Sequence, residues 1–539
     1  MIRLAALVVF VAGAAAAQTS DPQAATFKAG TRLVEVEVVV RNSKGPVTGL
    51  TKDDFTILDE GRRQRIDVFR AGQTNAAAAT IPQPPGFVSN RSGGEGAAGA
   101  AAYTAVLYDQ LNTRIDLKDY ERKALIKFVR GMRPGEHVAI YVLGRNLHVL
   151  QDFTDDPAKL IAALQHIDSG RDLMPANVHD AMSGFETDAL GNIILPGAMI
   201  ARSPQLAGEL GGSEIESAKN VAQVNAARND ETTFEALQVI TRHLSGMPGR
   251  RNLVWMMESP FTGLAFSGML VQANIALYPV LAHSLEFDPT GMFMGYANNV
   301  RQALNPGEGV PGATLMPDVM DTQRKARQVG ELTGGAGFGD AEDLQLAVKT
   351  AEEDSRSAYT LGYYPSEELL DGKYHRIAVK VAGGKPGRLE IRYRPGYVAS
   401  KQIVQGVAQK LTLADLFRNP LDDTEIGITA QSEPDATPGL YKVRLILDLH
   451  DLHLVHEGGH SRGSIELGFL AGNTAKVRTI AIDLTDEQLA AALRDGYQLR
   501  ASGVPATGGV IRVGAWEPST GAAGSLTIPA PATVATHTR

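Results

Sequence analysis

Oxygen-bearing side chains gather where an apolar stretch ends at residue 109. Residues 104–108 form an apolar run of strand length that ends in Asp109, and residues 110–113 then return to polar, turn-forming types. In a parallel α/β sheet the carboxyl end of a central strand is where ligands bind. Side-chain oxygens that follow such an acid at alternate positions can present hard ligands to a divalent cation. The sequence therefore predicts a candidate cation site at Asp109.

Two further stretches carry residues that could do chemistry, and the first surrounds Ser461. Gly459 to Gly463 reads Gly-His-Ser-Arg-Gly and matches the nucleophile-elbow pattern. That pattern works only with a strand before it and a helix after it. Because residues 464–469 alternate like a strand, we interpret the segment as a hairpin turn. An exported hydrolase stays a distant alternative.

Four histidines in the same region invite a metal hypothesis. Three-residue spacing on a strand sends successive side chains to opposite faces, so these imidazoles would not converge on one ion. We interpret the group as a solvated loop. The sequence has no Walker loop, Rossmann fingerprint or His-Glu-x-x-His motif, and we expect no enzyme activity. The histidines are His450, His453, His456 and His460.

The elements that would position Asp109 alternate between strand and helix. Repeated β-α units of this kind specify a doubly wound, mostly parallel sheet with right-handed crossovers. The predicted fold class is therefore α/β, flanked by β-sandwich domains. After the first strand, the expected strands are at 137–143, 252–257, 275–280 and 358–364, and the expected helices at 120–132, 157–167, 233–244, 323–332 and 340–354.

Composition and periodicity also divide the chain into domains. Short alternating strands indicate β modules at both ends. A stretch rich in Ala, Gly, Pro and Ser indicates a flexible linker. We hypothesise that a β-hairpin after the α/β domain completes the N-terminal module. The predicted boundaries are an N-terminal β module at 27–70, a linker at 71–101, the α/β domain at 102–366 with an insertion at 168–230, the hairpin at 367–400, and a C-terminal β-sandwich-like domain at 401–539.

The first residues read as an export signal. Residues 1–3 supply a short basic start, residues 4–11 an apolar core, and Ala15 to Ala17 a small-residue cleavage site. The apolar run is shorter than the ~20 residues of a membrane span. We therefore expect a signal peptide at 1–17 and cleavage near Ala17. The mature protein would be extracytoplasmic (periplasm, outer surface or secreted), with no transmembrane segment.

The bulk composition narrows the function classes. Hydrophobic residues make up 44% and charged residues 21% of the 539-residue chain, as in soluble globular proteins. With a formal net charge of -8 and no basic stripe, we expect no nucleic-acid partner. The sequence contains no cysteine, which excludes disulfides, zinc-thiolate sites and thiol catalysis.

The segment Gly249 to Trp255 (GRRNLVW), together with the acid-ended strand at Asp109, resembles a von Willebrand factor type A (VWA) domain. Four other stretches are similar to the VWA-related exported proteins of acidobacteria. The resemblance covers residues 30–400. The four stretches are VTGLTKDDF at 47–55, YTLGYYP at 359–365, DGKYH at 371–375 and YRPGYV at 393–398.

The resemblance implies a ligand-binding module. The family's metal-ion-dependent adhesion site holds Mg²⁺ or Mn²⁺ and leaves a position for an acidic side chain of a partner protein. Carried over by position, the implied ligands are Asp109, Thr113, Thr233 (or Thr232) and Glu258. Leu111 departs from the pattern, because it stands where the family has a Ser and has no oxygen to donate. Asn112 is a further candidate ligand, and the site is degenerate, since Mg²⁺ demands near-ideal octahedral geometry.

The expected function follows from the same resemblance. The chain would be an exported protein that binds a protein partner or a cell-surface polymer, in adhesion-type contacts, through the carboxyl-end face of its central sheet. An alternative of another class is a structural or assembly component of the cell envelope that uses no metal.

Overall fold

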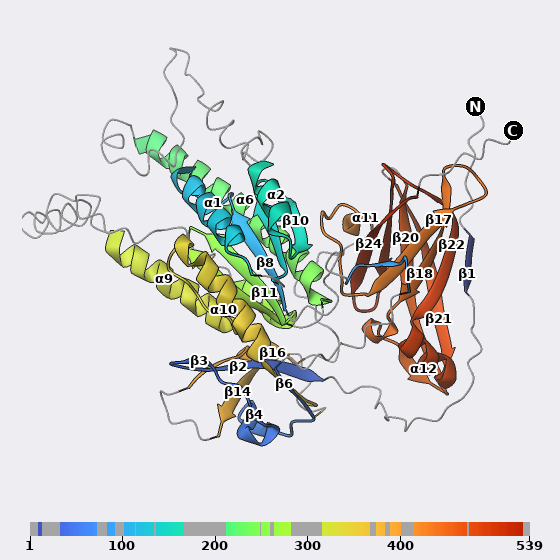
Figure 1. Ribbon diagram of the computed structural model, residues 1–539, viewed down its shortest axis with the longest axis horizontal. Coiled ribbons are helices and arrows are strands. Elements are labelled where there is room, and N and C mark those ends of the chain that lie inside the picture. The colour runs from blue at the N-terminus through green and yellow to red at the C-terminus, as the bar shows by residue number, and fades with distance from the viewer. Residues whose placement is uncertain are drawn as a thin grey trace, which may run out of the picture.

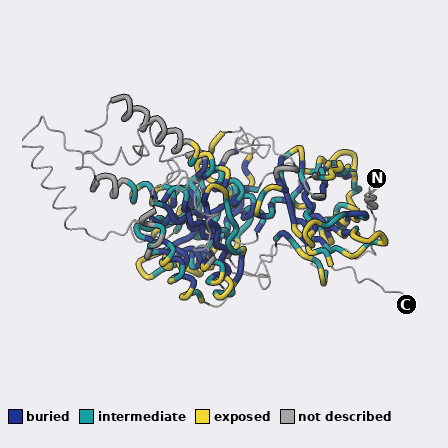
Figure 2. Tube along the Cα trace, turned by 90° about the horizontal axis from the view of Figure 1, so that it is seen from above, coloured by how far each residue is buried: buried dark blue, intermediate teal, exposed yellow. Residues whose placement is uncertain are grey.

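The computed structural model places an α/β body, a small β module and a larger β-sandwich next to one another (Figure 1). Buried residues gather inside these bodies and exposed residues lie along their rims (Figure 2). In the part of the chain described below, no helix is long and apolar enough to cross a membrane. The structure describes residues 9–12, 33–72, 84–91, 102–113, 115–133, 136–166, 212–247, 250–258, 264–281, 315–366, 373–382, 389–399, 413–471 and 474–531.

The α/β body is built on a five-stranded sheet in the order β10-β9-β8-β11-β12. The strand β8 runs parallel to both of its neighbours, and β11 runs parallel to β12. Only the edge strand β10 is antiparallel. The near-continuous apolar runs of these strands suit a sheet that is covered on both faces. The strands are β8 Ala102–Asp109, β9 Val138–Leu143, β10 Leu147–Thr154, β11 Arg250–Met257 and β12 Ile275–Leu281.

Helices cover both faces of this sheet. On one face α1, α2 and α10 pack against residues such as Val106 and Tyr108 of β8. On the other face α6, α7 and α9 pack against residues such as Ala105 and Leu107, because successive strand residues point to opposite sides. The helices are α1 Ile115–Arg130, α2 Pro157–His166, α6 Gly212–Ser245, α7 Leu264–Gln272, α9 Leu315–Leu332 and α10 Leu344–Ser357, which follows the 3₁₀ turn η3 Ala341–Asp343.

The small β module consists of two antiparallel sheets, ordered β15-β2-β13-β6 and β16-β14-β4-β5. One apolar core fills the space between them. The alternation of Val and Glu along β2 places every second side chain in that core. The elements are β2 Val34–Asn42, β3 Gly45–Pro46, η1 Lys52–Asp54, β4 Phe55–Asp59, β5 Arg62–Gln64, β6 Val68–Ala71, β13 Tyr359–Tyr363, β14 Tyr374–Val381, β15 Glu390–Arg392 and β16 Gly396–Val398.

The C-terminal sandwich packs two further antiparallel sheets around a single core. One sheet has the order β1-β22-β18-β17-β7, and the other β19-β20-β23-β24 with β21 also paired to β20. Its elements are β1 Val9–Ala12, β7 Val88–Ser89, α11 Leu413–Leu416, β17 Ile428–Pro434, β18 Leu440–Leu447, η5 Leu449–Asp451, β19 Val455–Glu457, β20 His460–Ala471, β21 Thr474–Thr485, α12 Asp486–Asp495, β22 Tyr497–Pro505, β23 Val510–Trp516 and β24 Ala523–Pro529.

The α/β class, based on a doubly wound, mostly parallel sheet, is wrong for the chain as a whole. Of the five sheets formed by described residues, four are antiparallel throughout. Parallel pairing is confined to β8, β9, β11 and β12. The physical reason is that the strand-helix rhythm holds only in the middle of the chain, whereas both flanks alternate with the two-residue period of half-exposed strands.

Three local predictions also need correction, because they depended on pairings that periodicity cannot show. The strand expected at 358–364 is β13, but it pairs with β2 and β6 in the small module, not with the central sheet. Strands β14 and β15 are not a hairpin; β14 pairs with β4 and β16, and β15 with β2. Both strands nevertheless pair with strands of the N-terminal module, as we hypothesised.

The third correction concerns the linker at 71–101. Residues 84–91 of the linker contribute β7 to the C-terminal sandwich. Residues 212–230 belong to α6, which continues without a break to Ser245. Residues 168–211 and most of the predicted signal peptide lie outside the described residues.

Candidate functional site

Asp109, the last residue of β8, lies fully buried at the carboxyl edge of the central sheet. Its Oδ1 accepts a hydrogen bond from the backbone N of Asn112 at 2.9 Å. Its Oδ2 accepts from Asn112 Nδ2 at 2.9 Å and from Trp255 Nε1, on β11, at 3.2 Å. Both oxygens of the Asp109 side chain therefore accept hydrogen bonds, and these bonds favour its ionised form. Burial raises the pKa of Asp109, while the donors from Asn112 and Trp255 act in the opposite direction.

The Asn112 side chain joins this strand end to α6. Its Nδ2 donates not only to Asp109 but also to Thr233 Oγ1, at 2.9 Å. Thr233 is fully buried, and its Oγ1 donates to the backbone O of Asn229 one turn earlier on α6, at 2.7 Å. One amide group therefore ties together the end of β8, the loop that follows it and the neighbouring helix.

A second carboxyl group, Glu121 of α1, is fully buried in the same region. Thr113 Oγ1 donates to the backbone O of Asp109 at 2.5 Å and lies 3.5 Å from Glu121 Oε1. Burial, and after it the charge of Asp109, raises the pKa of Glu121 well above its usual value. Because the hydroxyl of Thr113 makes its short bond to Asp109, its 3.5 Å contact with Glu121 is a weak one.

Leu111 and Glu258 complete the set of residues that the sequence singled out. Leu111 is partly buried and packs against the apolar core on the α6 side of the sheet. Glu258 follows Met257, the last residue of β11, and is half-buried. Because β8 and β11 are parallel neighbours, Glu258 lies at the same edge as Asp109. The charge of Glu258 adds to the rise in the Glu121 pKa.

These residues do not fit a Mg²⁺ or Mn²⁺ ion as they are arranged. Such an ion needs oxygen lone pairs directed at one point. The lone pairs of Asp109 and Thr233 that would serve accept instead from the amide of Asn112. Within the described ranges, no three His, Cys, Asp or Glu side chains gather so that they could hold a metal ion. The fold brings the implied ligands together, but it does not arrange them as a ligand set.

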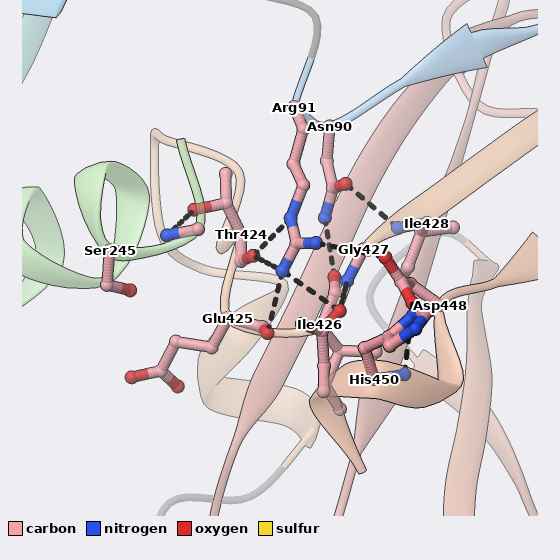
Figure 3. A network of polar contacts seen from close by, with 12 residues as sticks. Asn90, Arg91, Ser245, Thr424, Glu425, Ile426, Gly427, Ile428, Asp448 and His450 are labelled. Carbon is pink, nitrogen blue, oxygen red and sulfur yellow. Dashed lines mark hydrogen bonds and ion pairs between the residues drawn. The ribbon is translucent and has the colours of Figure 1, made fainter. Parts of the chain in front are cut away.

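A second polar network fixes the C-terminal sandwich to the end of α6 (Figure 3). The backbone N of Gly246 donates to Thr424 Oγ1 at 2.8 Å, and this oxygen lies 2.8 Å from the backbone O of His243. His243 is buried, and its Nδ1 lies 2.7 Å from the backbone O of Asp422. The loop that leads into β17 therefore satisfies groups at the helix end that would otherwise lack partners.

The segment before the α/β body strengthens this joint. Asn90 Nδ2 donates to the backbone O of Asp423 at 2.8 Å and of Ile426 at 2.9 Å. Arg91 donates to the backbone O of Thr424 at 2.9 Å through Nη2 (Figure 3). It also forms an ion pair of 2.9 Å with Asp451. Residues that the composition assigns to a flexible linker thus form an integral part of the sandwich.

Described residues of the four stretches that are similar to the VWA-related exported proteins meet in the small β module. Asp59, fully buried, accepts hydrogen bonds from Tyr363 Oη at 2.9 Å and Tyr397 Oη at 2.7 Å, and lies 3.0 Å from His375 Nδ1. Tyr359 Oη donates to the backbone O of Val47 at 2.9 Å. These three tyrosines pack between the strands and form hydrogen bonds with their hydroxyl groups, so they stabilise the module.

The Ser461 segment has the geometry of a hairpin. Strand β19 pairs with the start of β20, and the turn between them contains Gly458 and Gly459, both with positive φ. Ser461 Oγ and Asp486 Oδ1 lie 3.3 Å and 3.5 Å from the same atom, His456 Nδ1. A Ser-His-Asp relay needs the Ser and the Asp at opposite ring nitrogens. The hairpin interpretation is confirmed.

The four histidines do not converge. His450 Nδ1 lies 2.8 Å from Asp448 Oδ1, and His460 Nδ1 lies 2.6 Å from Asp483 Oδ1. The backbone N of His453 donates to Glu517 at 2.8 Å. Each ring or backbone group therefore has its own local partner.

Two residues of the carboxyl edge were missed in the sequence. Trp255 was noted only as part of the GRRNLVW segment, yet its indole N–H holds Asp109. Glu121 lies within a helical pattern and carries no motif. The available signal for both was position: an indole donor on the strand beside β8, and an acid on the buried face of a helix, where acids are rarely found unpaired.

Comparisons with known proteins assign no family to this chain. No protein-family model matches it, and no curated protein matches it. Among solved structures, the crystal structure of three N-terminal domains of the type V pili tip protein Mfa5 from Porphyromonas gingivalis is similar with a TM-score of 0.18 and 10% sequence identity, over 96% of this chain and 79% of that chain. A likeness this low carries no argument about fold or function.

Proposed function

We propose that the chain is an exported, non-enzymatic binding protein whose α/β body, which resembles a VWA domain, docks a partner at the carboxyl edge of its central sheet. The partner would be a protein or a cell-surface polymer.

The observation that carries this proposal is a preorganised polar cluster at the point where the strand order reverses. From β8 the chain continues to β9 on one side, whereas β11 and β12 lie on the other. Ligands of open α/β sheets bind at such a point. Asp109 is the last residue of β8, and Trp255 lies near the end of β11. These two strands flank the point of reversal. The hydrogen bonds of the cluster join its own members, which favours a role in binding over a role in catalysis.

Site-specific photo-crosslinking tests the proposal. A photoreactive residue at Glu258, which is half-buried at the carboxyl edge, should give a defined adduct in the native cell envelope. The matched control is a photoreactive residue at Arg130, which is exposed at the opposite end of α1. An excess of the unlabelled chain should abolish the adduct. Equal labelling from both positions, or no adduct from Glu258, would contradict the proposal.

A structural or assembly role is the second candidate, and the contacts between the bodies favour it. The buried Asp354 of α10 lies 2.6 Å from Arg41 Nη1 and 3.2 Å from Arg392 Nη1 of the small module. The joint at Thr424 fixes the sandwich in the same way. If the role is assembly, the Glu258 adduct would be absent and the chain would instead be incorporated in a large complex, which size-exclusion chromatography of solubilised envelope measures.

A further inference from the structure

We propose that the Asn112 side chain takes the place of a cation at the end of β8, so that the carboxyl edge keeps its shape without a metal ion. The inference deepens the proposed function, because it states that docking at this face is independent of divalent ions. The inference concerns the hydrogen bonds at the end of β8, so it can be tested on the chain alone, without a partner.

The hydrogen-bond pattern determines which way the Asn112 amide points. Thr233 Oγ1 has one proton, and that proton goes to the backbone O of Asn229. Toward Asn112 the hydroxyl can therefore only accept. Asp109 Oδ2, which also accepts from the Trp255 indole N–H, is an acceptor toward Asn112 as well. The group that lies between these two acceptors, 2.9 Å from each, must be the NH₂ end of the amide with its two N–H donors.

This donor has the bonding role that an ion would have. A cation at this place would draw together the Asp109 carboxylate and the Thr233 hydroxyl, and the two N–H groups of Asn112 do the same. The backbone N of Asn112 and the Trp255 indole add two more donors to the carboxylate. Hydrogen bonds from several N–H groups stabilise a buried carboxylate as its charge requires.

Leu111 makes the arrangement consistent with its neighbours. Its side chain packs into the core that α6 and Trp255 share. An oxygen ligand at this position would have to leave that apolar contact. Leu111 thus removes an oxygen ligand, and the Asn112 amide supplies the attraction that a cation would supply. Both residues belong to the same replacement of an ion by a hydrogen-bond donor.

An isosteric substitution separates this proposal from ordinary structural damage. Asn112→Asp keeps the shape of the side chain but turns its donor into a third acceptor between Asp109 and Thr233. We expect the full chain to show no change in melting temperature when millimolar Mg²⁺, Mn²⁺ or Ca²⁺ is added. The Asn112→Asp variant should melt about 3–8 °C lower without an ion and regain most of this loss with one.

Asn112→Ala is the matched control, since it removes the donor without adding an acceptor. It should lose about 3–8 °C and gain nothing from divalent ions. Should Asn112→Asp fail to fold, the Ala variant and the parent are compared in a Trp516→Phe background, which leaves Trp255 as the one Trp of the sequence. The fluorescence of Trp255 then follows the unfolding of both chains with and without divalent ions. A melting temperature of the unmodified chain that rises with Mg²⁺ overturns the proposal, and so does an Ala variant as stable as the parent. Either result leaves the crosslinking test of the proposed function intact.

Discussion

Replacing Gly246 with alanine should open the joint between α6 and the C-terminal sandwich. A Cβ at this position would lie 1.7 Å from the backbone O of Thr424 and 2.4 Å from its carbonyl carbon. Carbon atoms cannot approach backbone so closely, and neither atom belongs to a flexible side chain that could move away. The loop around Thr424 must therefore shift away from the helix end.

The size of the effect follows from the contacts that this shift breaks. Thr424 exchanges hydrogen bonds with the backbone of Arg242, His243 and Gly246. Neutral hydrogen bonds contribute about 1 kcal/mol each, and bonds to charged groups about 1.5–3 kcal/mol. Losing three neutral bonds, and weakening the contact of Arg91 with the same loop, should reduce the free energy of docking by about 3–5 kcal/mol.

Calorimetry and limited proteolysis measure this loss. The parent chain should unfold its α/β body and sandwich in one coupled transition, and Gly246→Ala should separate them and expose the connection near residue 420 to protease. Gly268→Ala is the matched control, because nothing lies within 4 Å of a Cβ there and Gly268 is inside α7. Alanine at that helical position should stabilise by about 0.5–1 kcal/mol. If the two variants behave alike, the joint does not hold the bodies together.

Three further predictions concern buried polar groups. Burial raises the pKa of Asp423 to about 6, so its ionised form is disfavoured in the folded state. The free energy of unfolding should therefore fall by about 2–3 kcal/mol as pH rises from about 4 to 6. Asp423→Asn should remove most of this pH dependence in urea unfolding measured across that range. Tyr397→Phe, which removes a donor to Asp59, should cost about 1–3 kcal/mol, whereas Tyr364→Phe, 43% exposed, should cost nothing measurable in the same thermal melt. Arg250→Gln removes the hydrogen bond to the backbone O of Gly334 and the ion pair with Glu37 of the small module and should cost about 3–5 kcal/mol; a loss under 1 kcal/mol in the same melt would contradict a stabilising role of these contacts.

Elements with a strong local signal could be predicted from the sequence. The apolar run 275–280 lies within β12, and the helix expected at 157–167 is α2, at whose start Asp156 Oδ1 accepts a hydrogen bond from the backbone N of Ala158. In both cases the deciding information, periodicity or a cap, is contained in adjacent residues. The same holds for Asp109, whose place at a strand end follows from the residues around it.

The remainder depends on contacts between distant residues. Nothing local distinguishes β13 as a partner of β2 from a partner of β12, because both pairings bury the same apolar side chains. The orientation of the Asn112 amide is set by Thr233, which lies far away in sequence and is itself oriented by Asn229. The sequence pattern thus predicts the carboxyl edge, but it predicts Asn112 as a metal ligand and hence an acceptor, whereas its environment makes it a donor.

The interleaved connectivity of the two β bodies constrains the order in which this chain can fold. During synthesis Val38 of β2 emerges early, but its partner Tyr359 follows only after the entire α/β body has been made. The sandwich likewise receives β7 long before β17 exists. Unpaired strand edges of this kind associate readily with other chains. A nascent chain therefore carries β2 and β7 without their partners until its later part has been made, and truncated forms that lack this part should aggregate.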